Sequence, residues 1–204
     1  MLDILTRTLL LISNALLVPV ILTLFGLLLW TLILCGGFVR EWYERRKIVP
    51  LLDRALIALR QHRPIAEAWI NLEAAPSGLP RRFFSYTAGN HTDEGVLEQA
   101  LSLLENDVAA ALGRHSFITR IAPILGLMGT LIPLGPALSG LAQGNMQALS
   151  GNLIVAFTAT VIGLLISGIS YGMGLGRRIW YARDMTTLES LAAAIESHRV
   201  VTHA

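Results

Sequence analysis

The sequence predicts an all-α, polytopic membrane protein with three transmembrane helices and a helical cytoplasmic domain. Of the 204 residues, 53% are hydrophobic and 15% are charged, and the mean hydropathy is +0.59. These values are typical of a membrane protein with a modest water-exposed part. Two runs contain no charged side chain: residues 8–39, which number 32, and residues 121–176, which number 56. Because one helical crossing needs about 20 apolar residues, the first run predicts one crossing and the second predicts two.

The first uncharged run predicts the first transmembrane helix. We expect Pro19 to mark the entry into the bilayer, with residues 19–39 spanning it and residues 9–18 extending the helix or lying at the outer interface. A cleaved signal peptide is a poorer interpretation, because the run exceeds a usual apolar signal core and has no clear small-x-small cleavage site. Residues 1–39 are therefore assigned to an outer N-terminal segment and the first span.

The polar region at residues 40–119 predicts a cytoplasmic helical domain. Pro50 is expected to open a short helix, and the Pro- and Gly-containing residues 75–80 are expected to interrupt the domain. A longer amphipathic helix is expected from about residue 93 to residue 112, and Gly113 follows its expected end.

The second uncharged run predicts a hairpin of two transmembrane helices at residues 120–176, where we expect the function to lie. In each half, small or hydroxyl-bearing residues recur at steps of three and four and so share one helix face. They are Gly126, Thr130, Pro133, Ala137 and Gly140 in the first half, and Ala156, Thr160, Gly163, Ser167, Ser170 and Gly174 in the second. Such faces allow helix backbones to approach closely in a bilayer, so the two stripes are expected to face protein or a narrow polar path rather than lipid.

The charge distribution predicts the orientation. Of the 16 Lys and Arg residues, 15 lie in residues 40–120 or 177–204, and the expected loop at residues 142–152 has none. The positive-inside rule therefore places the N-terminus outside and the C-terminus in the cytoplasm, in the inner (cytoplasmic) membrane. Residues 177–204 predict a cytoplasmic C-terminal helix, whose apolar face carries Leu188, Leu191, Ala192 and Ile195.

The sequence indicates no enzyme, cofactor, metal site or nucleic-acid partner. The five histidines lack metal-binding spacing and are expected to be solvated surface residues (His62, His91, His115, His198 and His203). Cys35 is the single cysteine, and the net charge of +2 is too small to favour nucleic acid. The expected spans contain no Asp, Glu, His or Lys, so a Ser or Thr nucleophile would have no base beside it.

The same absence constrains ion transport. A proton relay through a membrane normally uses ionisable side chains in the spans, and the expected spans here offer only hydroxyl groups. If protons pass along this protein, a titrating group must come from another chain. In the alternative interpretation, the hydroxyl groups bond to their own helix or join neighbouring helices.

Two segments resemble signatures of the MotA/TolQ/ExbB proton-channel family. Residues 122–130, Ala-Pro-Ile-Leu-Gly-Leu-Met-Gly-Thr, are similar to the second-span signature, whose core is Leu-Gly-Leu-x-Gly-Thr. Residues 156–164, Ala-Phe-Thr-Ala-Thr-Val-Ile-Gly-Leu, are similar to the third-span signature, Ala-Leu-x-x-Thr-Ala-x-Gly-Leu. The resemblance covers residues 118–176, and the three-span layout is similar to the TolQ/ExbB branch. Val155 stands where many ExbB-like chains carry Glu, which indicates a divergent member.

The resemblance implies a homopentamer around ExbD/TolR-like single-span partners, which supply an intramembrane Asp that carries the proton. Thr130 and Thr160 would then line the ion pathway. The chain would be the ion-conducting subunit of a motor that is driven by the proton-motive force and energises its partner. The alternative is a non-conducting membrane scaffold that assembles a larger complex. Close helix packing is assigned to Gly126, Gly129, Pro133, Gly163 and Ser167.

Overall fold

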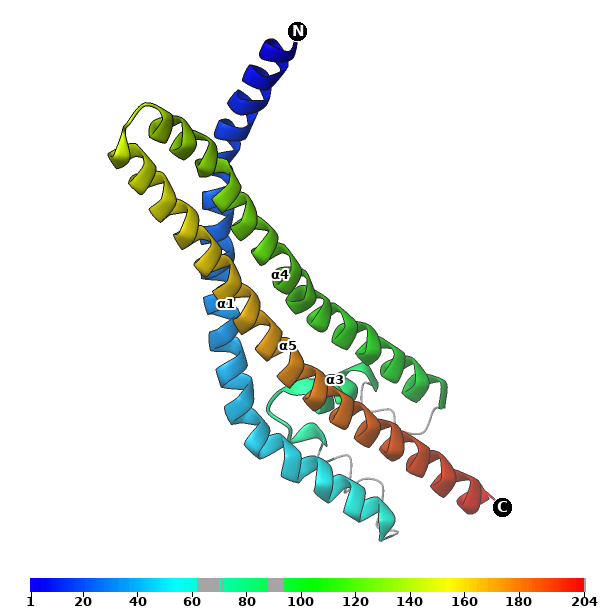
Figure 1. Ribbon diagram of the computed structural model, residues 1–204. Coiled ribbons are helices and arrows are strands. Elements are labelled where there is room, and N and C mark those ends of the chain that lie inside the picture. The colour runs from blue at the N-terminus through cyan, green and yellow to red at the C-terminus, as the bar shows by residue number, and fades with distance from the viewer. Residues whose placement is uncertain (62–69, 71, 88–93, 204) are drawn as a thin grey trace. The chain divides into compact units, whose positions relative to one another are not determined.

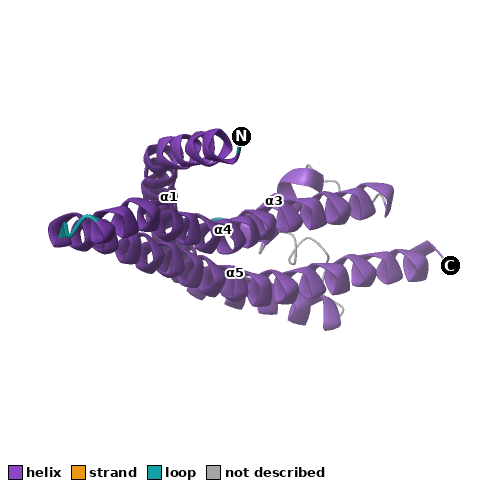
Figure 2. Cartoon of the chain, turned by 45° about the horizontal axis from the view of Figure 1, so that its top comes forward, coloured by secondary structure: helices purple, strands orange, loops and turns teal. Residues whose placement is uncertain are grey.

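The protein is described from a computed structural model, which places residues 1–61, 70, 72–87 and 94–203. These residues form helices and short connections without any strand (Figures 1 and 2). The labelled helices are α1 (Leu2–Arg60), α3 (Gly78–Thr87), α4 (Glu94–Ala142) and α5 (Met146–His203). The predicted all-α class is confirmed.

Three of these helices are long and apolar enough to cross a membrane. Their candidate membrane stretches lie within Ala15–Ala58 of α1, Gly95–Ala142 of α4 and Met146–Ile195 of α5. Large apolar side chains on them are exposed, for example Ile33 of α1 and Phe157 of α5. Exposure of this extent is unfavourable in water and favourable in lipid, so the helices fit the predicted three-span membrane protein.

The chain divides into two compact units. Unit 1 comprises residues 1–35 and 114–174, and unit 2 comprises residues 36–113 and 175–204. The core of unit 1 joins α1, α4 and α5 through buried apolar side chains: Val20, Leu24, Ile118, Ala122, Ile132, Ala159 and Ile166. Unit 1 is therefore a three-helix assembly built from the most apolar parts of the chain.

Unit 2 has a separate hydrophobic core. Buried side chains from α1, α3, α4 and α5 form it, among them Ile48, Leu52, Phe83, Leu104, Leu188 and Leu191. The apolar faces predicted for the helix before residue 113 and for the C-terminal helix both contribute to this core, which confirms them. The predicted interruption at residues 75–80 is present but shorter, because residues 75–77 are not helical, whereas α3 begins at Gly78, which has a φ of 82°.

Two predicted helix boundaries are wrong because the helices continue through them. Pro50 does not open a helix but lies inside α1, and Gly113 does not follow a helix end but lies inside α4. A proline removes one helical hydrogen bond, yet Ile48 before Pro50 and Leu52 after it are buried in the same core. An interior glycine costs only about 1 kcal/mol relative to alanine, which is too little to end a long helix.

The connection between α4 and α5 is shorter than the predicted loop at residues 142–152. Only residues 143–145 lie outside the helices, as the turn in Figure 2 shows. Gly144 has a φ of 72°, which favours glycine. The Asn145 Oδ1 accepts a hydrogen bond from the Ala148 backbone N at 3.0 Å and so caps α5. The cap explains why the helix starts before the predicted position.

Candidate functional site

The two small-residue stripes predicted from the sequence face each other in unit 1 and form what we call the α4–α5 seam. A Cβ atom built on Gly163 would lie 2.7 Å from the Ala122 carbonyl oxygen and 3.0 Å from the Gly126 Cα. One built on Gly129 would lie 2.6 Å from the Ala159 Cβ. The backbones are thus in direct contact, and no water molecule fits between them at this level.

Hydroxyl groups of α5 donate hydrogen bonds across the seam to α4. The Thr160 Oγ1 donates to the Gly126 carbonyl oxygen at 3.3 Å, and the Ser167 Oγ donates to the Thr119 carbonyl oxygen at 2.8 Å. Such bonds join helices in a bilayer, where each contributes on average about 0.6 kcal/mol. The hydroxyl groups of Thr160 and Ser167 therefore join the two helices.

Thr130, the other predicted pathway residue, bonds within its own helix. Its Oγ1 donates to the Leu127 carbonyl oxygen at 2.7 Å. Its neighbour Gly129 faces Ala159, which precedes Thr160. Thr160 bonds to Gly126, which lies one turn before Thr130, so the two threonines lie within about one helical turn of each other along the helix pair. Both side chains are partly buried.

The residues assigned to helix packing lie in or beside the seam. Gly126, Gly129 and Gly163 make its closest backbone approaches, and Ser167 bonds across it. Pro133 of α4 is fully buried. α4 stays helical through this proline, and through Pro123 and Pro136.

His115 contradicts the prediction that the histidines are solvated, because only 2% of its surface is exposed. The Ser170 Oγ lies 3.2 Å from the His115 carbonyl oxygen, to which it donates, and 3.5 Å from the His115 Nδ1. A Cβ atom on Gly174 would lie 3.1 Å from the His115 Cβ. His115 precedes Thr119, Ala122 and Gly126 by helical steps of four, seven and eleven, so the small-residue stripe itself signals a buried position. The other four histidines lie outside the residues whose side chains are described.

Val155, at the position where many ExbB-like chains carry Glu, lies on the exposed apolar surface of unit 1. It lines an apolar groove of about 270 Å³ with residues of α1 and α5, including Phe25 and Thr158. The Thr158 Oγ1 bonds to the Ile154 carbonyl oxygen at 2.7 Å. The groove therefore supplies no charge to an ion. Among the residues that the structure describes, His, Cys, Asp and Glu form no cluster of three or more that could hold a metal ion.

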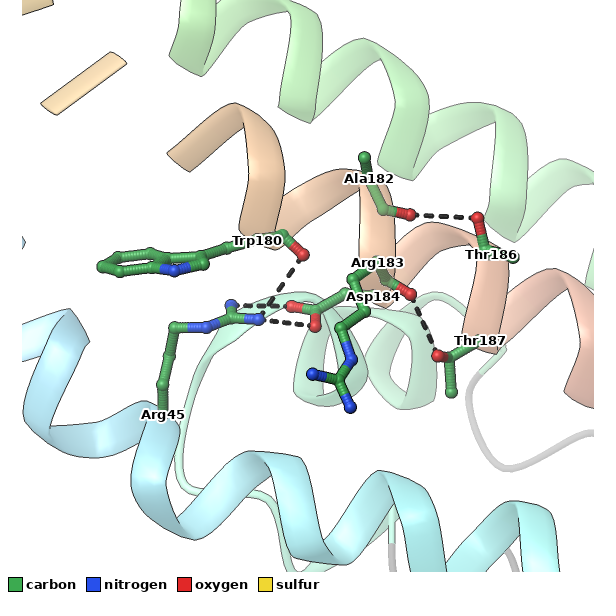
Figure 3. A network of polar contacts seen from close by, with 7 residues as sticks. All are labelled: Arg45, Trp180, Ala182, Arg183, Asp184, Thr186 and Thr187. Carbon is green, nitrogen blue, oxygen red and sulfur yellow. Dashed lines mark hydrogen bonds and ion pairs between the residues drawn. The ribbon is translucent and has the colours of Figure 1, made fainter. Parts of the chain in front are cut away.

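Unit 2 contains a buried polar contact between α1 and α5 that the sequence analysis missed (Figure 3). The Arg45 Nη1 and Nη2 donate to the two carboxylate oxygens of Asp184 at 2.8 and 2.7 Å. The guanidinium also donates to the Trp180 carbonyl oxygen at 3.4 Å and lies 5.1 Å from the Trp180 ring centroid. The side chains of Arg45 and Asp184 are only 9% and 3% exposed.

A second ion pair extends this contact. The Arg177 Nε donates to a Glu41 carboxylate oxygen at 2.8 Å, and the Phe38 and Trp180 rings stack with centroids 4.9 Å apart. Burial, and then the Glu41 carboxylate, raise the pKa of Tyr181 to about 12. A sequence signal existed, because Glu41 and Arg45 are four residues apart and Arg177 and Asp184 are seven apart. These spacings place each set of charges on one helix face.

A comparison with protein families matches residues 78–175 to the MotA/TolQ/ExbB proton channel family. The match contains the whole α4–α5 seam, both signature segments and α3. No curated protein matches the chain.

Proposed function

We propose, from the premise that this chain belongs to the MotA/TolQ/ExbB proton channel family, that it is the ion-conducting subunit of a motor driven by the proton-motive force. The observation that carries the proposal is that Thr130 and Thr160 lie within about one helical turn of each other along an apolar helix pair. No Asp, Glu, His or Lys occurs in residues 8–39 or 121–176, so the proton carrier is assigned to a single-span partner. That partner is of the ExbD/TolR type and brings an Asp into the membrane.

The two threonines suit a carboxyl group that changes its charge. A hydroxyl oxygen has two acceptor sites and one donor, so each threonine can accept a bond from the protonated acid or donate one to the carboxylate. The bond from Thr160 to the Gly126 carbonyl oxygen is long at 3.3 Å, whereas the bond from Thr130 is 2.7 Å. Thr160 is therefore the readier donor. A carboxylate left without such partners in hydrocarbon costs several kcal/mol.

The proposed assembly combines this chain with the partner that carries the Asp. Five copies of the chain are proposed to surround the partner spans, in the inner membrane, with the N-terminus outside and the C-terminus in the cytoplasm. The driving force is about 2.3 kcal/mol for each charge per 100 mV of membrane potential. That energy is of the same order as the cost of moving a partly solvated charge past the threonines.

A non-conducting scaffold is the second candidate, and the seam itself favours it. The hydroxyls of Thr130, Thr160 and Ser167 all donate to backbone carbonyls, and backbone contact at Gly126 and Gly163 leaves the seam dry. In the scaffold hypothesis, the small-residue stripes serve only to pack α4 against α5.

The double substitution Thr130→Val, Thr160→Val separates the two candidates. Valine removes the hydroxyl at nearly constant volume, and the double variant loses one interhelical bond, from Thr160, of about 0.6 kcal/mol and one bond within α4, from Thr130, so folding and assembly stay largely intact. The assay is proton uptake into proteoliposomes that hold the chain and its partner, with pentamer content measured by native mass spectrometry. Conduction requires that uptake is abolished in an intact complex, whereas the scaffold requires unchanged uptake and slightly weaker assembly.

Thr158→Val is the matched control. Thr158 lies on α5 two residues from Thr160, and its hydroxyl bonds to its own helix and lines the apolar groove instead of the seam. It is expected to leave uptake unchanged. Wild-type uptake by a fully assembled double variant would exclude the role proposed for Thr130 and Thr160.

A further inference from the structure

One side of α1 carries an exposed group of aromatic and basic side chains. They follow the first uncharged run, residues 8–39, in the sequence. We call Trp42, Tyr43, Arg46 and Lys47 the aromatic-basic face. Trp42 is 47% exposed and Tyr43 59% exposed, and Arg46 and Lys47 are exposed as well. Trp42 and Arg46, and Tyr43 and Lys47, are each four residues apart, so the four side chains lie on one half of the helix, away from the side on which Arg45 meets α5.

The face is pre-organised. The Arg46 guanidinium lies 5.4 Å from the Trp42 ring centroid, in cation–π geometry, and the Trp42 and Tyr43 centroids are 5.5 Å apart. Stacking on the indole leaves the guanidinium edge free to donate hydrogen bonds, and a planar guanidinium matches the geometry of a phosphate group.

The positive charge of the face is only partly balanced by the described residues around it. Among the described residues, Arg46 and Lys47 form no ion pair, whereas Arg40 pairs with Glu44 and Arg45 pairs with Asp184. Glu44, the acidic residue nearest in sequence, accepts hydrogen bonds from Arg40 and from the Ser77 hydroxyl and interacts more weakly with the Lys47 charge. The face therefore presents two cations that form no ion pair with the described residues, of which Lys47 has the Glu44 carboxylate within electrostatic range.

Its position along α1 matches the headgroup layer of a bilayer. The face begins two residues after the first charge, Arg40, that follows the uncharged residues 8–39. From Trp42 to Lys47 the helix rises about 7.5 Å, and the interfacial layer on each side of the hydrocarbon core is about 5–7 Å thick. Tryptophan and tyrosine favour this layer because their rings are apolar and their tips are polar.

We propose that the aromatic-basic face binds the headgroup of an anionic phospholipid. Arg46 and Lys47 contact the phosphate and any second negative group, and the Trp42 and Tyr43 rings pack at the level of the glycerol backbone. The contact selects anionic over zwitterionic lipid and fixes the depth of α1 in the membrane. It requires neither the partner nor ion flux, so it stands or fails independently of the function proposed above.

The test uses the full chain in phosphatidylcholine vesicles that contain a trace of spin-labelled phosphatidylglycerol or spin-labelled phosphatidylcholine. The fraction of motionally restricted label reports the relative affinity of each lipid for the protein surface. Wild-type chain is expected to prefer phosphatidylglycerol, and Arg46→Gln and Lys47→Gln are each expected to lower that preference by roughly fivefold at most, as expected for one cation near an anionic surface. Trp42→Ala, which removes the ring under Arg46, is expected to lower it as well.

Arg54→Gln is the matched control. Arg54 is exposed on the same helix, and it lies about 10 Å further along the axis than Lys47, beyond the Debye length of about 8 Å at physiological salt. The control should keep the wild-type preference, and inorganic phosphate at matched ionic strength should not displace the lipid. Equal restriction of both labels by the wild-type chain would overturn the proposal, as would an Arg54→Gln loss equal to that of Arg46→Gln. Displacement by inorganic phosphate would instead assign the face to a soluble anion and would also overturn it.

Discussion

The buried ion pair between Arg45 and Asp184 provides the strongest test of how unit 2 is held together. Arg45→Gln removes the cation and leaves the Asp184 carboxylate, which is 3% exposed, without its two charge-assisted hydrogen bonds. Removing one partner of a buried pair costs about 3–5 kcal/mol, because the remaining charge stays desolvated. We expect a loss of this size in the free energy of unfolding.

The assay is denaturant-induced unfolding of the detergent-solubilised chain, followed by tryptophan fluorescence. Arg82→Gln is the control, because Arg82 pairs with Asp107 at 2.9 Å but the two side chains are 58% and 31% exposed. Exposed pairs contribute about 0–1 kcal/mol. The double variant Arg45→Met, Asp184→Leu should recover most of the loss, since apolar replacements of both partners avoid the buried charge. Equal losses for Arg45→Gln and Arg82→Gln would refute the reasoning.

Three further predictions follow from single contacts. Gly163→Ala should destabilise unit 1 by about 1–3 kcal/mol, because its Cβ would lie 2.7 Å from the Ala122 carbonyl oxygen, whereas Gly168→Ala, with nothing within 4 Å, should cost nothing in the same unfolding assay. The raised pKa of Tyr181, about 12 against an ordinary value of 10.0, means that the folded chain keeps a proton that the unfolded chain loses. Stability should therefore fall as the pH rises from 10 to 12, and Tyr181→Phe should reduce this fall; the raised pKa of Tyr86, which bonds to Asp107, leaves a remainder of the same sign. In a Cys35→Ala background, Ser13→Cys and Gln147→Cys should react with impermeant maleimide on intact cells, and labelling of Ser77→Cys there would reverse the proposed orientation.

The sequence was sufficient to predict the all-α class and the three spans, because both depend on the length of uncharged runs. The small-residue stripes predicted close helix packing for a similar reason, since helical periodicity determines which residues share a face. Their direct contact at Gly126 and Gly163 was open at that stage, because a stripe on one helix does not identify its partner. The pattern predicts that each stripe faces protein or a narrow polar path, and it does not distinguish between the two.

Helix ends were predicted less well, because helix formation is cooperative and packing on both sides of a helix breaker can keep the helix continuous. Pro50 and Gly113 both disfavour helix locally by a few kcal/mol or less. Burial on either side of them, by Ile48 and Leu52 around Pro50, keeps α1 continuous. The Arg45–Asp184 contact joins residues 139 apart in sequence, and no local pattern pairs two charges over that distance. The solvated position predicted for His115 is wrong because its place on the small-residue stripe of α4 outweighs the polarity of its side chain.

The dry seam leads to a last prediction about conduction by the chain alone. Residues 8–39 and 121–176 contain no charged or histidine side chain, and backbone contact between Gly126 and Gly163 excludes water from the seam. A proton crossing unit 1 of a single chain would thus be unsolvated, at a cost of several kcal/mol or more. An imposed potential of 100 mV supplies only about 2.3 kcal/mol per charge. Under this potential, proteoliposomes that contain the chain without a partner are expected to take up protons no faster than protein-free liposomes. Addition of a single-span protein with an intramembrane Asp should open the path, and Asp→Asn in that protein should close it. Uptake by the chain alone, above the protein-free rate, would show that the charge carrier lies within this chain and would remove the need for a partner carboxylate.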